Sequence, residues 1–211
     1  MKIVAFSDTH GYHESLEIPD GDVLIFAGDH CESRRIEEVI KFVKWSSTLP
    51  HKHKLFVAGN HDWPYEDSNN SIEIISEQWT YLENKSVEID GVNFYGTPLQ
   101  PNFLDWAFNR PPAQLMFYYK AIPKNTNILI THCPPFGILD NLENGQKVGS
   151  IELLEALKDL PDLKLHIFGH IHHARGIASQ SSLISANVAI CNEQYQPTNK
   201  PLVIEIEEAR E

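Results

Sequence analysis

The chain has 211 residues, 42% of them hydrophobic, so it is long enough to bury a full core, and we expect a single domain spanning residues 1–211. Its 17 Lys and Arg against 29 Asp and Glu give a formal net charge of −12, which disfavours a broad nucleic-acid-binding face. Cys31, Cys133 and Cys191 show no CxxC spacing, which argues against a disulfide framework and against a thiolate zinc site.

The ends of the chain carry no pattern that we recognise as a targeting signal. The apolar run at residues 1–6 is too short for the core of a signal peptide, and no lipidation signal stands out at Ala209 to Glu211. No stretch approaches the roughly 18 consecutive apolar residues of a membrane span. We therefore expect a cytoplasmic protein that makes no contact with a membrane.

Short apolar runs alternate with helical patterns along the chain. The runs are rich in Val, Ile, Leu and Phe, which predicts strands buried on both faces of a largely parallel sheet. They are Ile3 to Phe6, Val23 to Ala27, Leu55 to Ala58, Ile128 to Thr131 and Leu165 to Phe168. Residues Glu37 to Trp45 repeat apolar side chains at helical spacing, and Ser150 followed by Glu152 predicts the start of a second helix.

The middle and the C-terminal part alternate polar and apolar residues. Residues Val87 to Tyr95 predict a hairpin that turns at Asp90 and Gly91, and Leu183 to Cys191 and Leu202 to Glu207 predict further strands. The expected fold is therefore α/β, with two mixed sheets packed together and helices outside. The stretch from Gly96 to Pro112 is the one long irregular segment, and it can rim a pocket.

Five polar islands lie at or just beyond the ends of the apolar runs. They are Asp8-Thr9-His10, Gly28-Asp29, Gly59-Asn60-His61-Asp62, Thr131-His132 and Gly169-His170-Ile171-His172. Their carboxylate, imidazole and amide donors include no sulfur, which suits Mn, Fe, Ni or Zn, with Mn favoured. The candidate metal ligands are Asp8, His10, Asp29, Asn60, His132, His170 and His172.

This donor set predicts a site for two divalent ions. A carboxylate shared by both ions, for which Asp29 is the candidate, can hold them roughly 3.5 to 4 Å apart and so activate a bridging water for in-line attack. Two such ions outweigh the charges of Asp8 and Asp29, so the site would attract an anionic phosphate ester into an acidic protein. His61 is the candidate general acid, with Asp62 orienting its ring and Asn60 beside it.

At these islands the sequence resembles the calcineurin-like metallophosphoesterase superfamily, whose motifs DxH, GDxx, GNH(D/E), a lone His and GHxH all occur here in order. Further similarity, for instance at Thr131 to Gly137 and at Gln196 to Asn199, points to its small metallophosphoesterase-domain-containing branch. The resemblance implies a four-layer αββα sandwich. It also implies one metal held by Asp8, His10, Asp29 and His172, and a second held by Asp29, Asn60, His132 and His170. Members of that branch act as phosphodiesterases, some of them on cyclic nucleotides.

We expect a phosphodiesterase of small substrates. A phosphomonoesterase acting on nucleotides or nucleic-acid ends, and a non-catalytic metal-stabilised binding module, are the alternatives. Phe103, Trp106, Arg110 and Arg175 are candidate substrate contacts, although a packed aromatic loop and solvated arginines are the more common explanations for such residues. His30, which follows Asp29, fits a structural imidazole better than a further ligand.

Overall fold

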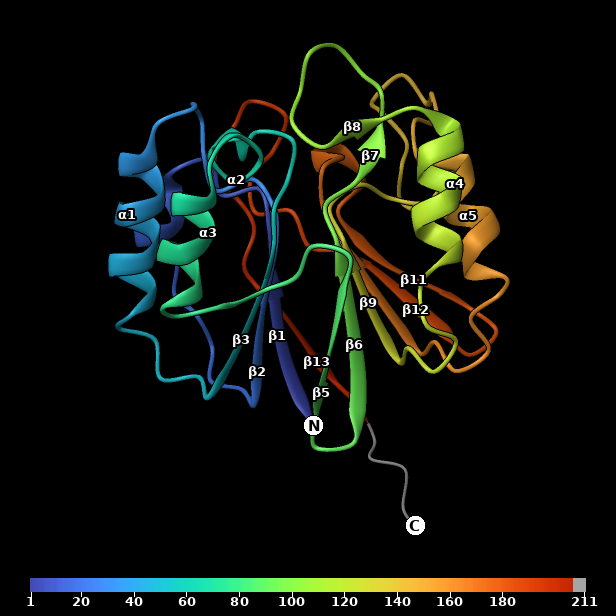
Figure 1. The fold of residues 1–211 in the computed structure, drawn as a ribbon, viewed down its shortest axis with the longest axis horizontal. Helices are drawn as coiled ribbons and strands as arrows, with labels where there is room; N and C mark the ends of the chain where they lie inside the picture. The colour runs from blue at the N-terminus through green and yellow to red at the C-terminus, as the bar shows by residue number, and fades with distance from the viewer. Residues whose placement is uncertain (207–211) are drawn as a thin grey trace.

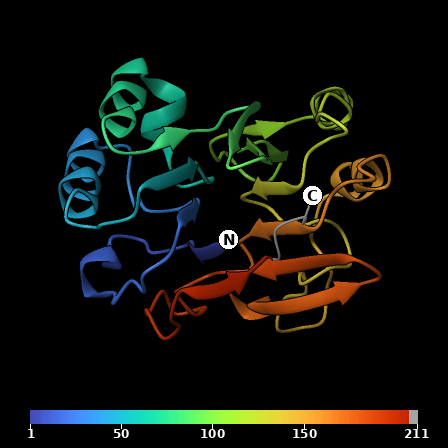
Figure 2. The ribbon, with the colours of Figure 1, turned by 90° about the horizontal axis from the view of Figure 1, so that it is seen from below.

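The computed structural model describes residues 1–206 and consists of two β-sheets packed face to face, with helices on the outer face of each. Seen from below, helix, sheet, sheet and helix follow one another across the molecule (Figure 2). This arrangement confirms the predicted α/β sandwich of two mixed sheets. The end of the last predicted strand at Glu207, and residues Ala209 to Glu211, lie outside the described residues.

The first sheet contains the N-terminal strands. Its order is β13 (Leu202–Glu205), β1 (Lys2–Phe6), β2 (Val23–Ala27), β3 (His53–Val57) and β4 (Thr80–Tyr81). The strands β1 to β4 run parallel, and β13 pairs antiparallel with β1. The predicted strand at Leu55 to Ala58 thus begins two residues earlier than expected, at His53.

The second sheet is also mixed. Its order is β11 (Gly176–Gln180), β12 (Leu183–Asn187), β10 (Leu165–Phe168), β9 (Ile128–Thr131), β6 (Val92–Thr97) and β5 (Lys85–Ile89). The inner four strands are parallel, and both edge strands are antiparallel. The predicted hairpin is confirmed: β5 and β6 join at Asp90 and Gly91, whose positive φ angles of 49° and 76° suit a tight turn.

Helices α1 (Ile36–Ser46), α2 (Trp63–Asp67) and α3 (Asn69–Ser76) lie outside the first sheet, and α4 (Pro112–Lys120) and α5 (Ile151–Leu157) lie outside the second (Figure 1). Both predicted helices are confirmed, and the Ser150 side chain caps α5 by accepting a hydrogen bond from the Leu153 N–H. Two single turns of 3₁₀-helix, η1 (Tyr12–Ser15) and η2 (His172–Ala174), and a short parallel pair, β7 (Gln100–Pro101) with β8 (Asn109–Arg110), complete the elements.

The core explains why the strands are apolar throughout. In β1, Ile3 and Ala5 join the cluster between the sheets, whereas Val4 and Phe6 join the cluster beneath the helices. A strand covered on both faces keeps no polar side. Within residues 1–206, no helix has both the length and the apolar character needed to cross a membrane.

Candidate metal centre

The seven predicted ligands meet at one end of the sandwich. Asp8 and His10 follow β1, Asp29 follows β2 and Asn60 follows β3, while His132 follows β9 and His170 and His172 follow β10. All seven side chains come from the loops at the carboxyl ends of parallel strands, where open α/β sheets place their ligands. The structure therefore unites residues that are up to 164 positions apart in the sequence.

Two groups of donors are recognisable within this cluster. In the first, Asp8, His10 and His172 offer ligand atoms within 4.8 Å of one another. Here His172 Nε2 lies 3.3 Å from both His10 Nε2 and Asp8 Oδ1. Ring nitrogens and a carboxylate aimed at the same space are the arrangement that a divalent cation requires.

In the second group, Asp29, His132 and His170 lie within the same 4.8 Å of one another. The His132 Nε2 atom is 3.0 Å from Asn60 Oδ1 and 3.2 Å from Asp29 Oδ2. Asp29 also groups with His10, so it faces both sets of donors. That position is the one expected of a carboxylate shared by two ions.

The backbone holds these ligands in place. Asp8, His10, Asp29 and His170 all have positive φ angles, between 41° and 69°, a conformation that is uncommon for non-glycine residues. The motif glycines allow the loops to approach closely. A Cβ atom on Gly59 would collide with the carboxylate of Asp29, so only glycine fits at that position.

The donor set fits metal ions by its hydrogen bonds as well. His132 Nδ1 lies 2.8 Å from the Ala27 carbonyl oxygen, and His172 Nδ1 lies 2.9 Å from the Asn192 carbonyl oxygen. Each ring must donate its Nδ1–H there, which leaves the Nε2 lone pair free to bind a metal. The His10 Nδ1 atom, in contrast, is buried and has no hydrogen-bond partner among residues 1–206.

The charges in the cluster favour a cation. Burial alone raises the pKa of Asp8, but its hydrogen bond to His172 and the charges of His172 and His132 outweigh burial and lower the pKa to about 2. Burial lowers the pKa of His132, yet the charge of Asp29 and a hydrogen bond to it raise the pKa to about 9. Burial and the charge of His132 lower the pKa of His170 to about 4. Burial raises the pKa of Asp29 as well, but the charges of His132 and His61 outweigh burial and lower it well below its usual value. Both carboxylates are therefore ionised, and a positive charge among them is stabilised.

Sequence comparison agrees with this geometry. The family model described as calcineurin-like phosphoesterase matches residues 1–174. The chain belongs to the calcineurin-like phosphoesterase family. It is 34% identical to the metallophosphoesterase domain-containing protein 1 of Homo sapiens and to that of Mus musculus, over 97% of this chain and 71% of each relative. A UPF0046 protein of Caenorhabditis elegans is 38% identical over 98% of this chain and 75% of its own length.

Asp62 is the last residue of the Gly-Asn-His-Asp motif. Its carboxylate accepts hydrogen bonds from backbone N–H groups rather than from the imidazole of His61. Its Oδ2 accepts hydrogen bonds from the N–H groups of Asp29 and Gly59, both at 2.8 Å, and its Oδ1 accepts those of His30 and Cys31 at 3.1 and 3.0 Å. None of its hydrogen bonds within residues 1–206 reaches the His61 ring. The geometry thus corrects our expectation that Asp62 orients His61: it fixes the two loops that carry Asp29 and Asn60.

The contacts of His30 favour the structural role that the sequence suggested, although its ring also groups with Cys31 and Asp62. Its Nε2 atom lies 2.7 Å from the Tyr65 hydroxyl, and its ring stacks on Phe42 at a centroid distance of 4.4 Å. Burial lowers the pKa of His30 to about 3, so the ring is neutral at pH 7. The sequence could not show that its partner is a tyrosine hydroxyl rather than a backbone carbonyl.

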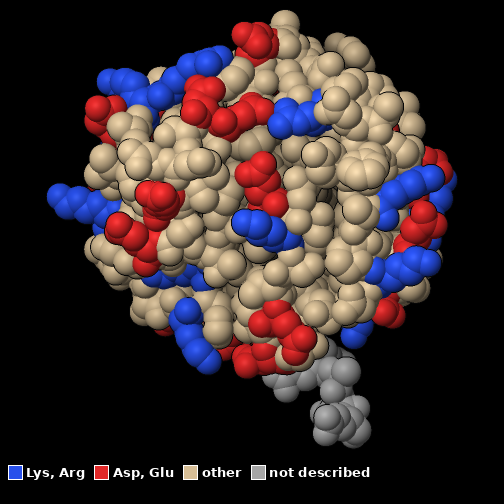
Figure 3. Space-filling view, in the orientation of Figure 1, with Lys and Arg blue, Asp and Glu red and all other residues tan. Residues whose placement is uncertain are grey.

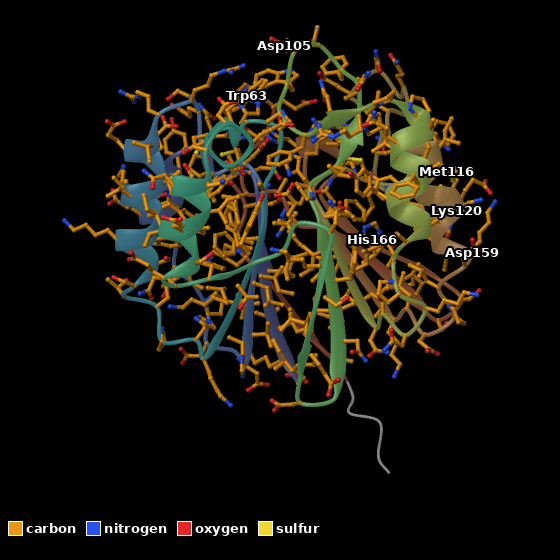
Figure 4. The ribbon with its side chains drawn as sticks, in the orientation of Figure 1. Trp63, Asp105, Met116, Lys120, Asp159 and His166 are labelled. Atoms are coloured by element: carbon orange, nitrogen blue, oxygen red, sulfur yellow. The ribbon has the colours of Figure 1, made fainter. Side chains whose placement is uncertain are left out.

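The cluster of candidate metal ligands opens into a cleft of about 390 Å³, which we call the metal cleft. Asp29, Asn60, His61, His170 and His172 contribute to its lining. Its walls carry Phe103, Leu104 and Trp106 from the loop 102–108, whose tip is marked by Asp105 (Figure 4), and Tyr195 from the opposite side. The irregular segment between Gly96 and Pro112 thus forms one rim of the site, although β7 and β8 give it more order than expected.

His61 lies at the edge of this cleft. A ring nitrogen of His61 is within 4.8 Å of donor atoms of His10 and Asp29. Its ring packs against Trp106 at a centroid distance of 4.2 Å and an angle of 34°. The imidazole is thus held next to the place where an ester would meet the metal ions, which suits a proton donor.

The two arginines expected to contact substrate are directed elsewhere. Arg110 donates to Glu66 Oε1 at 2.9 Å, and Arg175 donates to the Lys200 carbonyl oxygen at 2.8 Å. Neither lines the metal cleft. Sequence reasoning missed Tyr195, whose ring lies 4.7 Å from that of His10, and Asn192, whose carbonyl positions His172. The only sequence signal for these two residues was their position just before the segment 196–199, which is similar to the family.

Proposed function

We propose that this protein is a metal-dependent phosphodiesterase that hydrolyses small substrates. The observation that supports this most strongly is the complete set of seven donors around Asp29, with His61 beside it at the cleft. Members of this family are generally metal-dependent hydrolases, and none of the donors is missing here. Divalent ions bound by these residues, of which Mn is our preferred candidate, would supply positive charge for the phosphoryl oxygens and activate the attacking water.

The protein's own residues account for the rest of the reaction. The oxygen of a water molecule forms a bond to phosphorus and releases a proton to solvent, and the bond from phosphorus to the leaving oxygen breaks. His61 supplies the proton that the leaving oxygen takes up and then regains a proton from solvent. Asp62 holds the backbone of the Asp29 and Asn60 loops during this step, and Trp106 restrains the His61 ring. Phe103, Trp106 and Tyr195 can stack on an aryl or nucleobase group in the cleft.

A small substrate suits the surface of the molecule. On the face shown in Figure 3, Lys and Arg are interspersed with Asp and Glu rather than gathered in one patch. The net charge of −12 would repel a long polyanion. Three free, buried cysteines are in keeping with a reducing compartment such as the cytoplasm, which is our proposal for the location.

The proposal is tested by removing metals with a chelator, refilling with Mn²⁺, and comparing bis(p-nitrophenyl) phosphate with p-nitrophenyl phosphate. We expect at least one tightly bound transition metal per chain and a higher kcat/KM for the diester. A preference for the monoester would indicate a phosphomonoesterase. No bound metal, together with no hydrolysis after refilling, would leave only a non-catalytic role.

His61→Ala separates catalysis from binding. Loss of a general acid should lower kcat by roughly 10² to 10⁴ with unchanged metal content, and most strongly for an ester with an alkyl leaving group, which needs a proton more than p-nitrophenolate does. His53→Ala, at the opposite end of β3, is the matched control and should leave kcat unchanged. Equal activity of His61→Ala and wild type would exclude the proposed role of His61.

A further inference from the structure

A second cavity, of about 520 Å³, adjoins the metal cleft. The two share Phe103, Leu142, His170 and Ile171 as lining residues. Because His170 is a candidate metal ligand and borders both, a phosphorus atom at the metal centre would lie where the two cavities meet. A monoester has one organic group to place there, whereas a diester has two.

The two cavities differ in charge. The metal cleft contains the carboxylate of Glu193, which lies 3.6 Å from His173, beside the aromatic side chains. The second cavity contains no carboxylate among its lining residues, and Lys147 is the one Lys or Arg that lines either cavity within residues 1–206. The other polar residues that line the second cavity are Gln100, Asn102 and Gln146, which carry side-chain amides, together with Cys133 and His170. We therefore call it the Lys147 cavity.

The Lys147 ammonium group is available to a ligand. It lies 5.9 Å from the centroid of the Phe136 ring and, among the described residues, takes part in no ion pair. Its backbone is held by a bridge to Asn141 and by the turn in which Leu142 N–H donates to the Gln146 carbonyl oxygen. An exposed cation on an ordered turn, among the lining residues of a cavity in an acidic protein, attracts anions.

The opposite charges of Glu193 and Lys147 favour one of the two orientations in which a diester can occupy the two cavities. An uncharged aromatic group is favoured in the metal cleft, where Trp106 and Tyr195 offer ring faces and Glu193 repels an anion. A negatively charged group is favoured on the other side of His170, where Lys147 offers the opposite charge without a competing carboxylate.

We propose that the Lys147 cavity binds the second ester group of a phosphodiester and that Lys147 selects an ester group carrying an additional negative charge. The substrate class is then a diester with one aromatic or nucleobase-bearing group and one anionic group. This inference rests on the proposed function and specifies the substrate of the same site.

The test uses three p-nitrophenyl phosphodiesters whose second ester group is 3,3-dimethylbutyl, 2-carboxyethyl or 2-(trimethylammonio)ethyl. These groups are similar in size and carry charges of 0, −1 and +1. With the Mn²⁺-loaded protein, we expect the carboxyethyl ester to have the highest kcat/KM and the trimethylammonioethyl ester the lowest, with about 2- to 5-fold between neighbours, as an exposed ion pair provides. Lys147→Met should remove this order, and Lys147→Glu should reverse it.

Lys124→Met is the matched control, because it removes the same charge from an exposed position that precedes β9, away from both cavities. It should keep the wild-type order, which excludes an effect of net charge. An unchanged order in Lys147→Glu would overturn the inference while leaving the phosphodiesterase activity itself established.

A binding measurement keeps the inference testable if no ester is hydrolysed, an outcome that would refute the proposed function instead. Calorimetry with ethyl phosphate and 2-carboxyethyl phosphate should give a lower Kd for the carboxyethyl compound in the wild type and a higher one in Lys147→Glu. Equal Kd values for the two compounds in the wild type would overturn the role of Lys147.

Discussion

Replacing Asp62 by Ala should destabilise the fold because one carboxylate accepts four buried backbone N–H groups. Removing the acceptor of a buried charged network typically costs about 3 to 5 kcal/mol, and we expect a loss of about 4 kcal/mol in the free energy of unfolding. For a chain of this size, that corresponds to a melting temperature lower by roughly 8 to 16 °C.

Asp62→Asn should lie between the wild type and Asp62→Ala. An asparagine oxygen retains two of the four hydrogen bonds, and its NH₂ group faces the other two N–H donors, each of which costs about 1 to 3 kcal/mol when left unpaired. Burial, together with the charge of Asp29, raises the pKa of Asp62 to about 6, so its ionisation opposes folding at pH 7. The neutral amide avoids that cost, and the expected net loss is about 2 kcal/mol.

Urea denaturation at pH 7 in the presence of a chelator measures these losses as shifts in midpoint at constant slope. Asp67→Asn is the control, because the Asp67 side chain is 46% exposed and pairs with an exposed arginine, so its loss should stay within about 0.5 kcal/mol. If Asp62→Ala unfolded within 1 kcal/mol of the wild type, our account of the loop network would be wrong. Normal stability with a 100-fold lower kcat in Asp62→Asn would instead restore a role for Asp62 in orienting His61.

Two further predictions concern the same region. Gly59→Ala should lower the affinity for metal and the stability of the fold, because the alanine Cβ would meet the Asp29 carboxylate and lie 2.7 Å from His132 Cε1. A dissociation constant for Mn²⁺ equal to that of the wild type would contradict this. Burial lowers the pKa of His166 from 6.5 to about 3, so unfolding takes up a proton between these values, and stability falls as pH decreases from 6.5 to 3. The free energy of unfolding from urea denaturation between pH 6.5 and 4 should depend less on pH in His166→Leu, by about 1.4 kcal/mol per pH unit; parallel profiles would disprove this.

The parts of the fold that follow from local patterns were predictable. Apolar runs closed by Gly, Asp or His gave β1, β2, β9 and β10, and Asp90-Gly91 gave the hairpin, because these signals act within a few residues. Helices α2 and α3 were not expected, since five and eight residues are too short to show a helical period clearly. Helix α4 was missed because it begins at Pro112, the last residue of the segment that we interpreted as irregular.

The candidate site divides in the same way. The identity of the ligands followed from motifs at strand ends, but the partners of each side chain depend on contacts between distant segments. Arg110 pairs with Glu66, 44 residues away, and no sequence pattern linked them. Lys147 was overlooked because nothing in its neighbourhood shows that the loop following His132 turns back toward the metal centre.

The donors are divided between the two sheets. Four of them follow strands of the first sheet, namely Asp8, His10, Asp29 and Asn60, and three follow strands of the second, namely His132, His170 and His172. Neither layer holds a whole coordination sphere, so capture of the ions must wait until the layers have docked. Ions bound there would connect the two sheets, and their binding free energy would add to the free energy needed to separate them.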